Sequence, residues 1–167
     1  MALPDSILDA TGDWPEGRLV ALEILRSRFP EFRFVSLISP EHTPPWALVR
    51  ETGFEGAVYE DRRFMREFFI SIETFTEGLE SDVDAPNVHR AAEDAFTRAA
   101  LGNISVGGGT SWIVDYSLEE PARRLSDWAS ASGPVQTADL PTNWTRLHSL
   151  HRIAIKRSDV GPHVYDY

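Results

Sequence analysis

Residues 63–75, RFMREFFISIETF, decide the fold, because they form the longest run that alternates with the two-residue period of a half-buried strand. One predicted face is apolar, and its members are Phe64, Phe68, Ile70, Ile72 and Thr74. The other face mixes acids with aromatic residues, and its members are Glu67, Phe69, Ser71, Glu73 and Phe75. The pattern predicts a central strand whose apolar face packs against a helix. The mixed face is suited to contact with another protein.

Length and composition indicate one domain with a single core. The chain has 167 residues, of which 42% are hydrophobic. We expect an arm over residues 1–12, one domain over residues 13–156 and a polar tail over residues 157–167. The absence of cysteine excludes a disulfide framework and a thiolate metal site. No signal peptide or membrane-length apolar run is present, so we expect a soluble protein made in a cytoplasm.

The charge balance argues against free nucleic-acid binding. The formal net charge is −10 and the isoelectric point is near 4.9, whereas proteins that neutralise many phosphates carry a basic patch. Fifteen of the 16 basic residues are arginines, and only Lys156 is a lysine. Arginine forms planar bidentate ion pairs and stacks on aromatic rings, which favours interfaces.

Two amphipathic helices are predicted. The first covers about residues 13–28, with Asp13 as its cap. The second covers residues 87–101, with Asp84 as its cap and Pro86 in its first turn. An acidic link over residues 77–84 joins the second helix to the central strand, and its composition is typical of a solvated loop.

Further strands complete the predicted sheet. We expect them at residues 32–38, 46–51, 112–116 and 147–156. Residues 57–61 fit a short strand or a loop, residues 118–125 are ambiguous, and residues 130–143 read as a long loop. This order predicts an α+β fold, with a mostly antiparallel sheet and both helices packed on one face.

No pattern indicates an active site, and we expect neither enzymatic activity nor a cofactor. Residues 107–110, GGGT, lack the lysine and the following helix of a phosphate loop. His148 and His151 lie three apart on a predicted strand, so they point to opposite faces and cannot bind one metal ion. The neighbouring carboxylates Glu119 and Glu120 are typical of surface charge.

Four tryptophans lie at strand ends or in loops, namely Trp46, Trp112, Trp128 and Trp144. Two interpretations stay open for them. They could form a satellite core beneath the loops, or they could be anchors of a protein interface.

Several pieces, in this order, carry a resemblance to a known family. They are the first helix, Pro44-Pro45 followed by the strand with Arg50, the turn Thr52-Gly53, the central strand that begins at Arg63, the helix around residues 91–96, and the closing strand at residues 152–156. Over residues 16–156 the chain resembles the tail-terminator proteins of long-tailed bacteriophages, especially those that infect actinobacteria.

The resemblance implies a structural virion protein that is assembled in the host cytoplasm. Such proteins resemble tail-tube subunits and form six-membered rings. The ring caps the tail tube, stops its growth and provides the surface on which the head-tail connector docks. Its partners would be further copies of itself, the tail tube protein and the connector protein, while DNA passes through the lumen without specific binding.

The candidate sites follow from this expectation. The candidate interface residues are Trp46, Arg50, Glu67, Phe69, Glu73, Phe75, Trp112, Trp128 and Trp144. The candidate channel or rim acids are Glu77, Glu80, Asp82 and Asp84. The alternatives are another neck or tube component, and a small α+β ligand-binding or enzymatic domain with a pocket between its sheet and loops.

Overall fold

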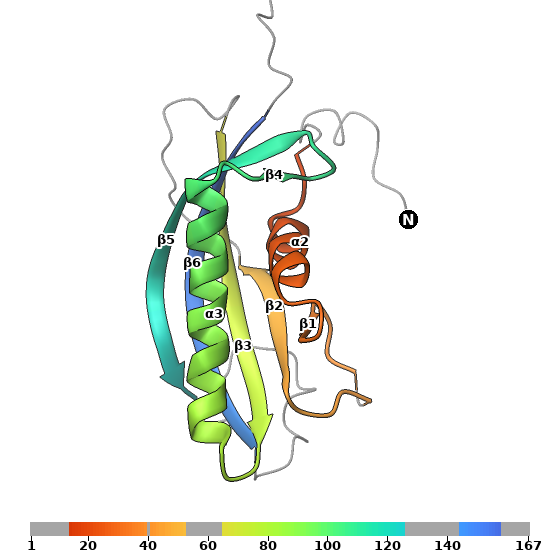
Figure 1. The fold of residues 1–167 in the computed structure, drawn as a ribbon, viewed down its shortest axis with the longest axis vertical. Helices are drawn as coiled ribbons and strands as arrows, with labels where there is room; N and C mark the ends of the chain where they lie inside the picture. The colour runs from red at the N-terminus through yellow and green to blue at the C-terminus, as the bar shows by residue number, and fades with distance from the viewer. Residues whose placement is uncertain (1–13, 40, 53–64, 126–143, 158–167) are drawn as a thin grey trace, which may run out of the picture.

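The computed structural model describes residues 14–39, 41–52, 65–125 and 144–157, which form one six-stranded sheet and two helices (Figure 1). The strand order is β1-β2-β3-β6-β5-β4, and all neighbours are antiparallel except β1 and β2. The elements are β1 (Arg33–Val35), β2 (Trp46–Thr52), β3 (Met65–Glu77), β4 (Ser105–Val106), β5 (Ser111–Arg124), β6 (Trp144–Arg157), α2 (Gly17–Arg28) and α3 (Ser81–Leu101). The predicted α+β class is confirmed.

Both helices lie on the same face of the sheet, as predicted (Figure 1). Their apolar sides meet Phe68, Ile70 and Ile72 of β3 and Ile153 and Ile155 of β6 in one buried cluster. These five residues recur at every second position, so each strand turns one side toward the helices. We call the opposite side of the sheet, which faces away from α2 and α3, the second face.

The strand β3 holds the centre of the sheet. It pairs with β2 from Thr52↔Phe69 to Trp46↔Phe75 and with β6 from Met65↔Lys156 to Glu77↔Trp144. The predicted alternation is confirmed, since Phe68, Ile70 and Ile72 face the helices. The described strand runs two residues beyond the predicted end.

The helix α2 ends at Arg28 as predicted but begins at Gly17, later than expected. Its cap position is Glu16, which makes no capping hydrogen bond through its side chain, and the predicted cap Asp13 lies outside the described residues. Gly17 is buried against Phe68. The first residue of α2 therefore lies in close contact with β3.

The helix α3 begins at Ser81, six residues before the predicted start, so residues 81–84 of the predicted acidic loop belong to the helix, whereas the acids of this segment are exposed as predicted. Glu77 is the last residue of β3, a turn at Gly78 follows, and Glu80 is the cap position of α3. Asp82 and Asp84 lie in the first turn, where carboxylates stabilise the positive end of the helix dipole. Pro86 is inside the helix, where it lacks the backbone N–H of an i→i−4 hydrogen bond.

The strand boundaries also differ from the prediction. The first strand is limited to Arg33–Val35, and the two-residue strand β4 was not predicted. The ambiguous residues 118–125 belong almost entirely to β5, and β6 begins three residues before its predicted start. Three glycines with positive φ, Gly107, Gly108 and Gly109, form the turn between β4 and β5.

Other expectations fall outside the described residues. These are the arm over residues 1–12, the undecided residues 57–61, the loop over residues 130–143 and the tail from residue 158 onward. Among the described helices, none is long and apolar enough to cross a membrane.

Replacing Gly17 with alanine tests the contact between α2 and β3. A Cβ at this position would lie 2.3 Å from Cγ of Phe68, so the core must shift. We expect Gly17→Ala to lower the free energy of unfolding by about 1–3 kcal/mol, because overpacking outweighs the gain in helix propensity. Urea denaturation measures the change, and Ser27→Ala on the exposed side of α2 should stay within about 0.5 kcal/mol. Equal stability of the two variants would contradict the expectation.

Candidate functional site

Three of the predicted interface aromatics meet on the second face. Trp46 of β2 stacks on Phe75 of β3, with ring centroids 4.0 Å apart and planes inclined by 15°. Trp144 of β6 packs edge-on against Phe75, with centroids 6.4 Å apart. Together with Leu48, Trp46 and Phe75 form a second buried cluster, on which the half-buried Trp144 packs.

For Trp46, the burial of this cluster decides between a satellite core and an interface anchor. Trp46 and Phe75 are both 0% exposed, so the prediction that they are accessible anchors was wrong. The satellite-core alternative describes them. Trp112, by contrast, is 37% exposed at the start of β5, and Trp128 lies outside the described residues.

The predicted contact residue Glu73 is part of a buried ion pair on the second face. Its carboxylate accepts a hydrogen bond from Nε of Arg146 over 3.0 Å, and the side chains are 11% and 3% exposed. The guanidinium carbon of Arg146 lies 5.8 Å from the ring centroid of Phe75. Glu73 is therefore a core residue and not a solvated contact, which corrects the prediction.

Arg152 of β6 organises the polar part of the second face. Its guanidinium binds three carboxylates, from Glu67 of β3 and from Asp115 and Glu119 of β5. The distances are 2.9 Å to Asp115 and 3.3 Å to Glu119. The Glu67 side chain is only 8% exposed, so this residue too is held within the chain.

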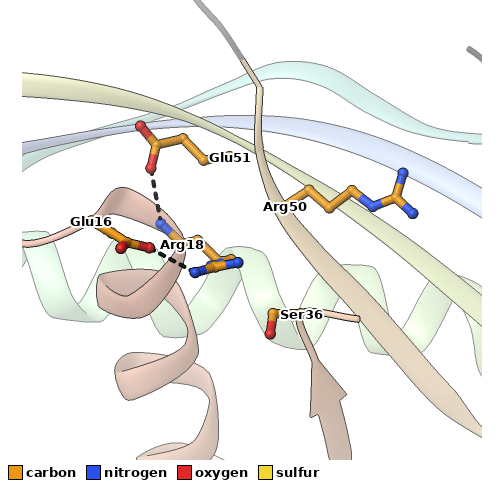
Figure 2. A pocket seen from close by; sticks show the side chains of 5 residues that line it. All are labelled: Glu16, Arg18, Ser36, Arg50 and Glu51. Atoms are coloured by element: carbon orange, nitrogen blue, oxygen red, sulfur yellow. Dashed lines mark hydrogen bonds and ion pairs between the residues drawn. The ribbon is translucent and has the colours of Figure 1, made fainter. Parts of the chain in front are cut away.

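The remaining interface candidates lie near the edge strand β2. Phe69 is half-buried on β3, and its carbonyl accepts a hydrogen bond from the hydroxyl of Thr52 over 3.2 Å. Arg50 lines an open cleft of about 390 Å³ between the start of α2 and β2, together with Glu16, Arg18, Ser36 and Glu51. In Figure 2, Glu51 points toward α2 and Arg50 points away from it.

At the start of α2, two glutamates of this cleft accept hydrogen bonds from Arg18. Arg18 pairs with Glu16 over 2.7 Å, and the backbone N–H of Arg18 donates to Glu51 over 3.3 Å (Figure 2). Glu51 thereby places a carboxylate at the positive end of the α2 dipole. Arg18 is thus paired, whereas Arg50 forms no ion pair among the described residues.

The predicted channel acids are gathered at one end of the molecule, where β3 turns into α3 (Figure 1). Glu77, Glu80, Asp82 and Asp84 are all exposed. Asp82 makes only a long ion pair of 3.5 Å with Arg124 of β5. The structure therefore places these four carboxylates on one accessible surface, with Glu77 at the end of β3, Glu80 at the cap position of α3, and Asp82 and Asp84 in its first turn.

A buried hydrogen-bond chain, which no sequence pattern predicted, connects α3 with the sheet. It runs from Thr74 of β3 through His89 of α3, Ser149 and His151 of β6 to Tyr116 of β5. The successive distances are 3.1, 2.7, 2.7 and 3.0 Å. The strand pattern contained part of the signal, because Ser149 and His151 share the parity of Ile153 and Ile155.

The two strand histidines point to opposite faces, as predicted. His151 faces α3 and is 0% exposed, whereas His148 lies beside Glu73 in the β3–β6 register on the second face. Burial lowers the pKa of His148, and the carboxylates of Glu73 and Glu120 partly oppose that effect. The described residues contain no group of three or more His, Cys, Asp or Glu placed to hold a metal ion.

The hydroxyl of Ser149 lies between two imidazoles, a juxtaposition that nucleophilic enzymes also use. Ser149 is 1% exposed and His89 is 4% exposed, so a substrate cannot reach the hydroxyl. The arrangement satisfies buried polar groups and holds elements together.

No protein-family model matches this chain, and no curated protein sequence matches it significantly.

Removing one member of the buried ion pair tests whether it holds the second face. We expect Glu73→Gln to lower the free energy of unfolding by about 3 kcal/mol, because Arg146 keeps a buried charge without its carboxylate. The paired replacement Glu73→Leu with Arg146→Met should lose less than the single variant, since it leaves no buried charge. Urea denaturation measures both.

The control is the exposed pair of Asp94 and Arg98, whose side chains are 47% and 63% exposed. Asp94→Asn should change the stability by less than about 0.5 kcal/mol. A Glu73→Gln variant as stable as Asp94→Asn would show that the buried pair contributes nothing.

Proposed function

We propose that this chain is a structural virion protein, a tail terminator of a long-tailed bacteriophage. Six copies form a ring that caps the tail tube, stops its growth and offers the docking surface for the head-tail connector. The proposal is supported by the family resemblance of the sequence. The segments that carry it belong to α2, β2, β3, α3 and β6, which are parts of one sheet-and-helix unit.

The observation that carries the proposal is the outer edge of β5. This strand has 14 residues and pairs with β6 along most of its length, but its outer side pairs with β4 only at Ser111 and Trp112. No described strand pairs with the outer side of residues 114–124. An unpaired edge offers backbone donors and acceptors to a strand of another chain, as an assembling subunit requires.

This edge also carries features that limit unspecific pairing. Its register against β6 shifts at three places, between Ile113 and Asp115, between Leu118 and Glu120, and between Glu120 and Arg123. It contains Pro121 and the exposed cations Arg123 and Arg124. Bulges, proline and charge on an edge prevent general aggregation, so a partner must match them. These features favour one specific neighbour.

The acidic end of the molecule supports the second part of the proposal. Glu77, Glu80, Asp82 and Asp84 give an exposed negative surface on a chain of net charge −10. A duplex that must slide through a ring is best served by a lining that does not neutralise its phosphates. We propose that this end lines the lumen or its rim.

The cleft beside Arg50 favours a different function, that of a ligand-binding domain. It is open, measures about 390 Å³ and is lined by two arginines, two glutamates and a serine. A ligand-binding domain would be dispensable for building tails. Imaging of tails therefore separates the two functions.

Deletion of the gene from its parent genome tests the proposal directly. We expect overlong tails or tails without heads in electron micrographs, because nothing stops the tube or joins it to the head. Complementation with the intact gene should restore tails of uniform length joined to heads. Normal joined tails after the deletion would contradict the proposal and leave the ligand-binding function.

Charge reversal on β5 tests the role of its edge in the same complementation assay. Arg123 and Arg124 make only exposed ion pairs, so Arg123→Glu with Arg124→Glu should change the stability by less than about 1 kcal/mol. We expect the folded double variant to fail to restore tail length. The control, Arg90→Glu with Arg98→Glu on the exposed side of α3, should restore it. Restoration by both variants would exclude the β5 edge as the contact.

A further inference from the structure

The helix α3 is attached to the sheet by very few large side chains. Its buried residues are Ser81, Ala85, His89, Ala92, Ala95, Phe96 and Ala99. Alanine removes little apolar area from water, so four of these seven contribute weakly to the attachment. His89 and Phe96 are the two large members. The hold of α3 on the sheet therefore depends strongly on what these two residues contact.

Both large residues of α3 contact the buried hydrogen-bond chain. His89 is a member and connects Thr74 of β3 with Ser149 of β6. The ring of Phe96 packs edge-on against His151, with centroids 5.4 Å apart, and tilted against Tyr116, with centroids 5.7 Å apart. The apolar and the polar attachment of α3 thus share the same partners.

With neutral imidazoles, every hydrogen bond of the buried hydrogen-bond chain has one donor and one acceptor. When both rings carry their proton on Nε2, the phenol of Tyr116 donates to Nδ1 of His151, and Nε2–H of His151 donates to the hydroxyl of Ser149. That hydroxyl donates to Nδ1 of His89, and Nε2–H of His89 donates to Thr74. Each of the three inner groups then donates once and accepts once along the chain.

Protonation of both histidines disrupts this pattern. A doubly protonated imidazole ring can only donate, so Ser149 would receive two N–H groups and its own hydrogen would have no acceptor in the chain. Two buried positive charges would also stand on either side of one oxygen atom. Buried charges without a counterion are strongly unfavourable.

From this geometry we infer that the five-residue chain is an acid-sensitive latch, which fixes α3 to the sheet when both imidazoles are neutral and releases the helix when both take up a proton. The released element begins at Ser81 and carries Asp82 and Asp84 of the exposed acidic end of the molecule. The latch does not depend on the proposed function, because it is a property of the single chain.

The protonation behaviour of the two histidines agrees with a latch. Burial lowers the pKa of His89 to about 4, with a further decrease from His148 and an opposing hydrogen bond to the Leu147 backbone. Burial lowers the pKa of His151 to about 3, with contributions from His89 and His148. In a detached helix both groups return toward 6.5. The attachment is therefore fully present above pH 6.5 and is lost as the pH falls toward 4.

Few other titratable or charged groups face the latch from the surrounding elements. Burial raises the pKa of Tyr116, and the charge of Glu93 of α3 raises it further, so the phenol stays protonated and able to donate. His148 of β6 acts from the second face. Thr74 of β3 is uncharged, and the buried residues of α2 are apolar or glycine. Among the described residues, the two latch histidines therefore dominate the response between pH 6.5 and 4.

Hydrogen exchange of the α3 amides measures the latch in the intact chain. Each histidine that is protonated only after release multiplies the opening constant by about ten per pH unit, so two approach about 100-fold per unit below pH 6. We expect protection of α3, corrected for intrinsic exchange, to fall by more than about tenfold between pH 5.5 and 4.5. Equal protection at both pH values would overturn the inference.

A matched pair of variants assigns the response to these histidines. His89→Gln with His151→Gln removes both titrating groups, so α3 protection should lose its pH dependence even where the variant is less stable overall. His42→Gln removes a histidine beside Trp46, outside the latch, and should keep the full dependence. A double variant with the dependence of the intact chain would overturn the inference.

A measurement on the unmodified chain covers the case in which the double variant does not fold. Imidazole ¹⁵N shifts report the protonation and tautomer of each ring. We expect His89 and His151 to remain neutral at pH 5.5, each with one protonated nitrogen. Titration of either ring near pH 6.5 in the folded chain would overturn the latch, whatever the fate of the tail-terminator proposal.

Discussion

The pairing of β3 with β6 is the constraint on which the rest of the structure depends. Thirteen consecutive pairs, from Met65↔Lys156 to Glu77↔Trp144, run without a register shift. Because side chains alternate between faces, a slip of β3 by one residue would exchange the two faces of that strand relative to β6. The apolar side chains of β3 would then leave the helices, and Glu73 would enter the main core.

This register places two different polar arrangements on the two faces. On the helix side, Ser149 and His151 of β6 stand in the same row as Ile153, where they meet His89 in a neutral hydrogen-bond chain. On the second face, Arg146 and Arg152 stand in the alternate row and bind carboxylates of β3 and β5. Neutral groups need only hydrogen bonds when buried, whereas charges need counterions as well. Each face therefore has the partners that its polar groups require.

The same arrangement divides the molecule into a fixed interior and accessible margins. The residues of the second face that were candidates for contacts, Trp46, Glu73 and Phe75, are used within the chain. The accessible features are the outer edge of β5, the exposed acids where β3 turns into α3, and the cleft with Arg50. Interactions with other molecules are thus expected at the margins of the sheet, where backbone groups and charges remain available.

The sequence by itself determined the class of the fold, because period-two and period-3.6 patterns are local properties of the chain. The alternation at residues 63–75 predicted β3 and its helix-facing side. Local signals were weaker at the element ends. Pro86 indicated a helix start, but the tertiary structure accommodates it inside α3, and Pro121 did not stop β5.

Only the tertiary structure decided which polar groups meet. Glu73 and Arg146 are 73 positions apart, and His89 and Ser149 are 60 apart, so no local pattern could pair them. The burial of Trp46 was equally undetermined, since a tryptophan at a strand end suits a satellite core and an interface alike. The physical reason is that partners and burial follow from the register between distant strands, which the chain selects only when the whole sheet and its helices pack together.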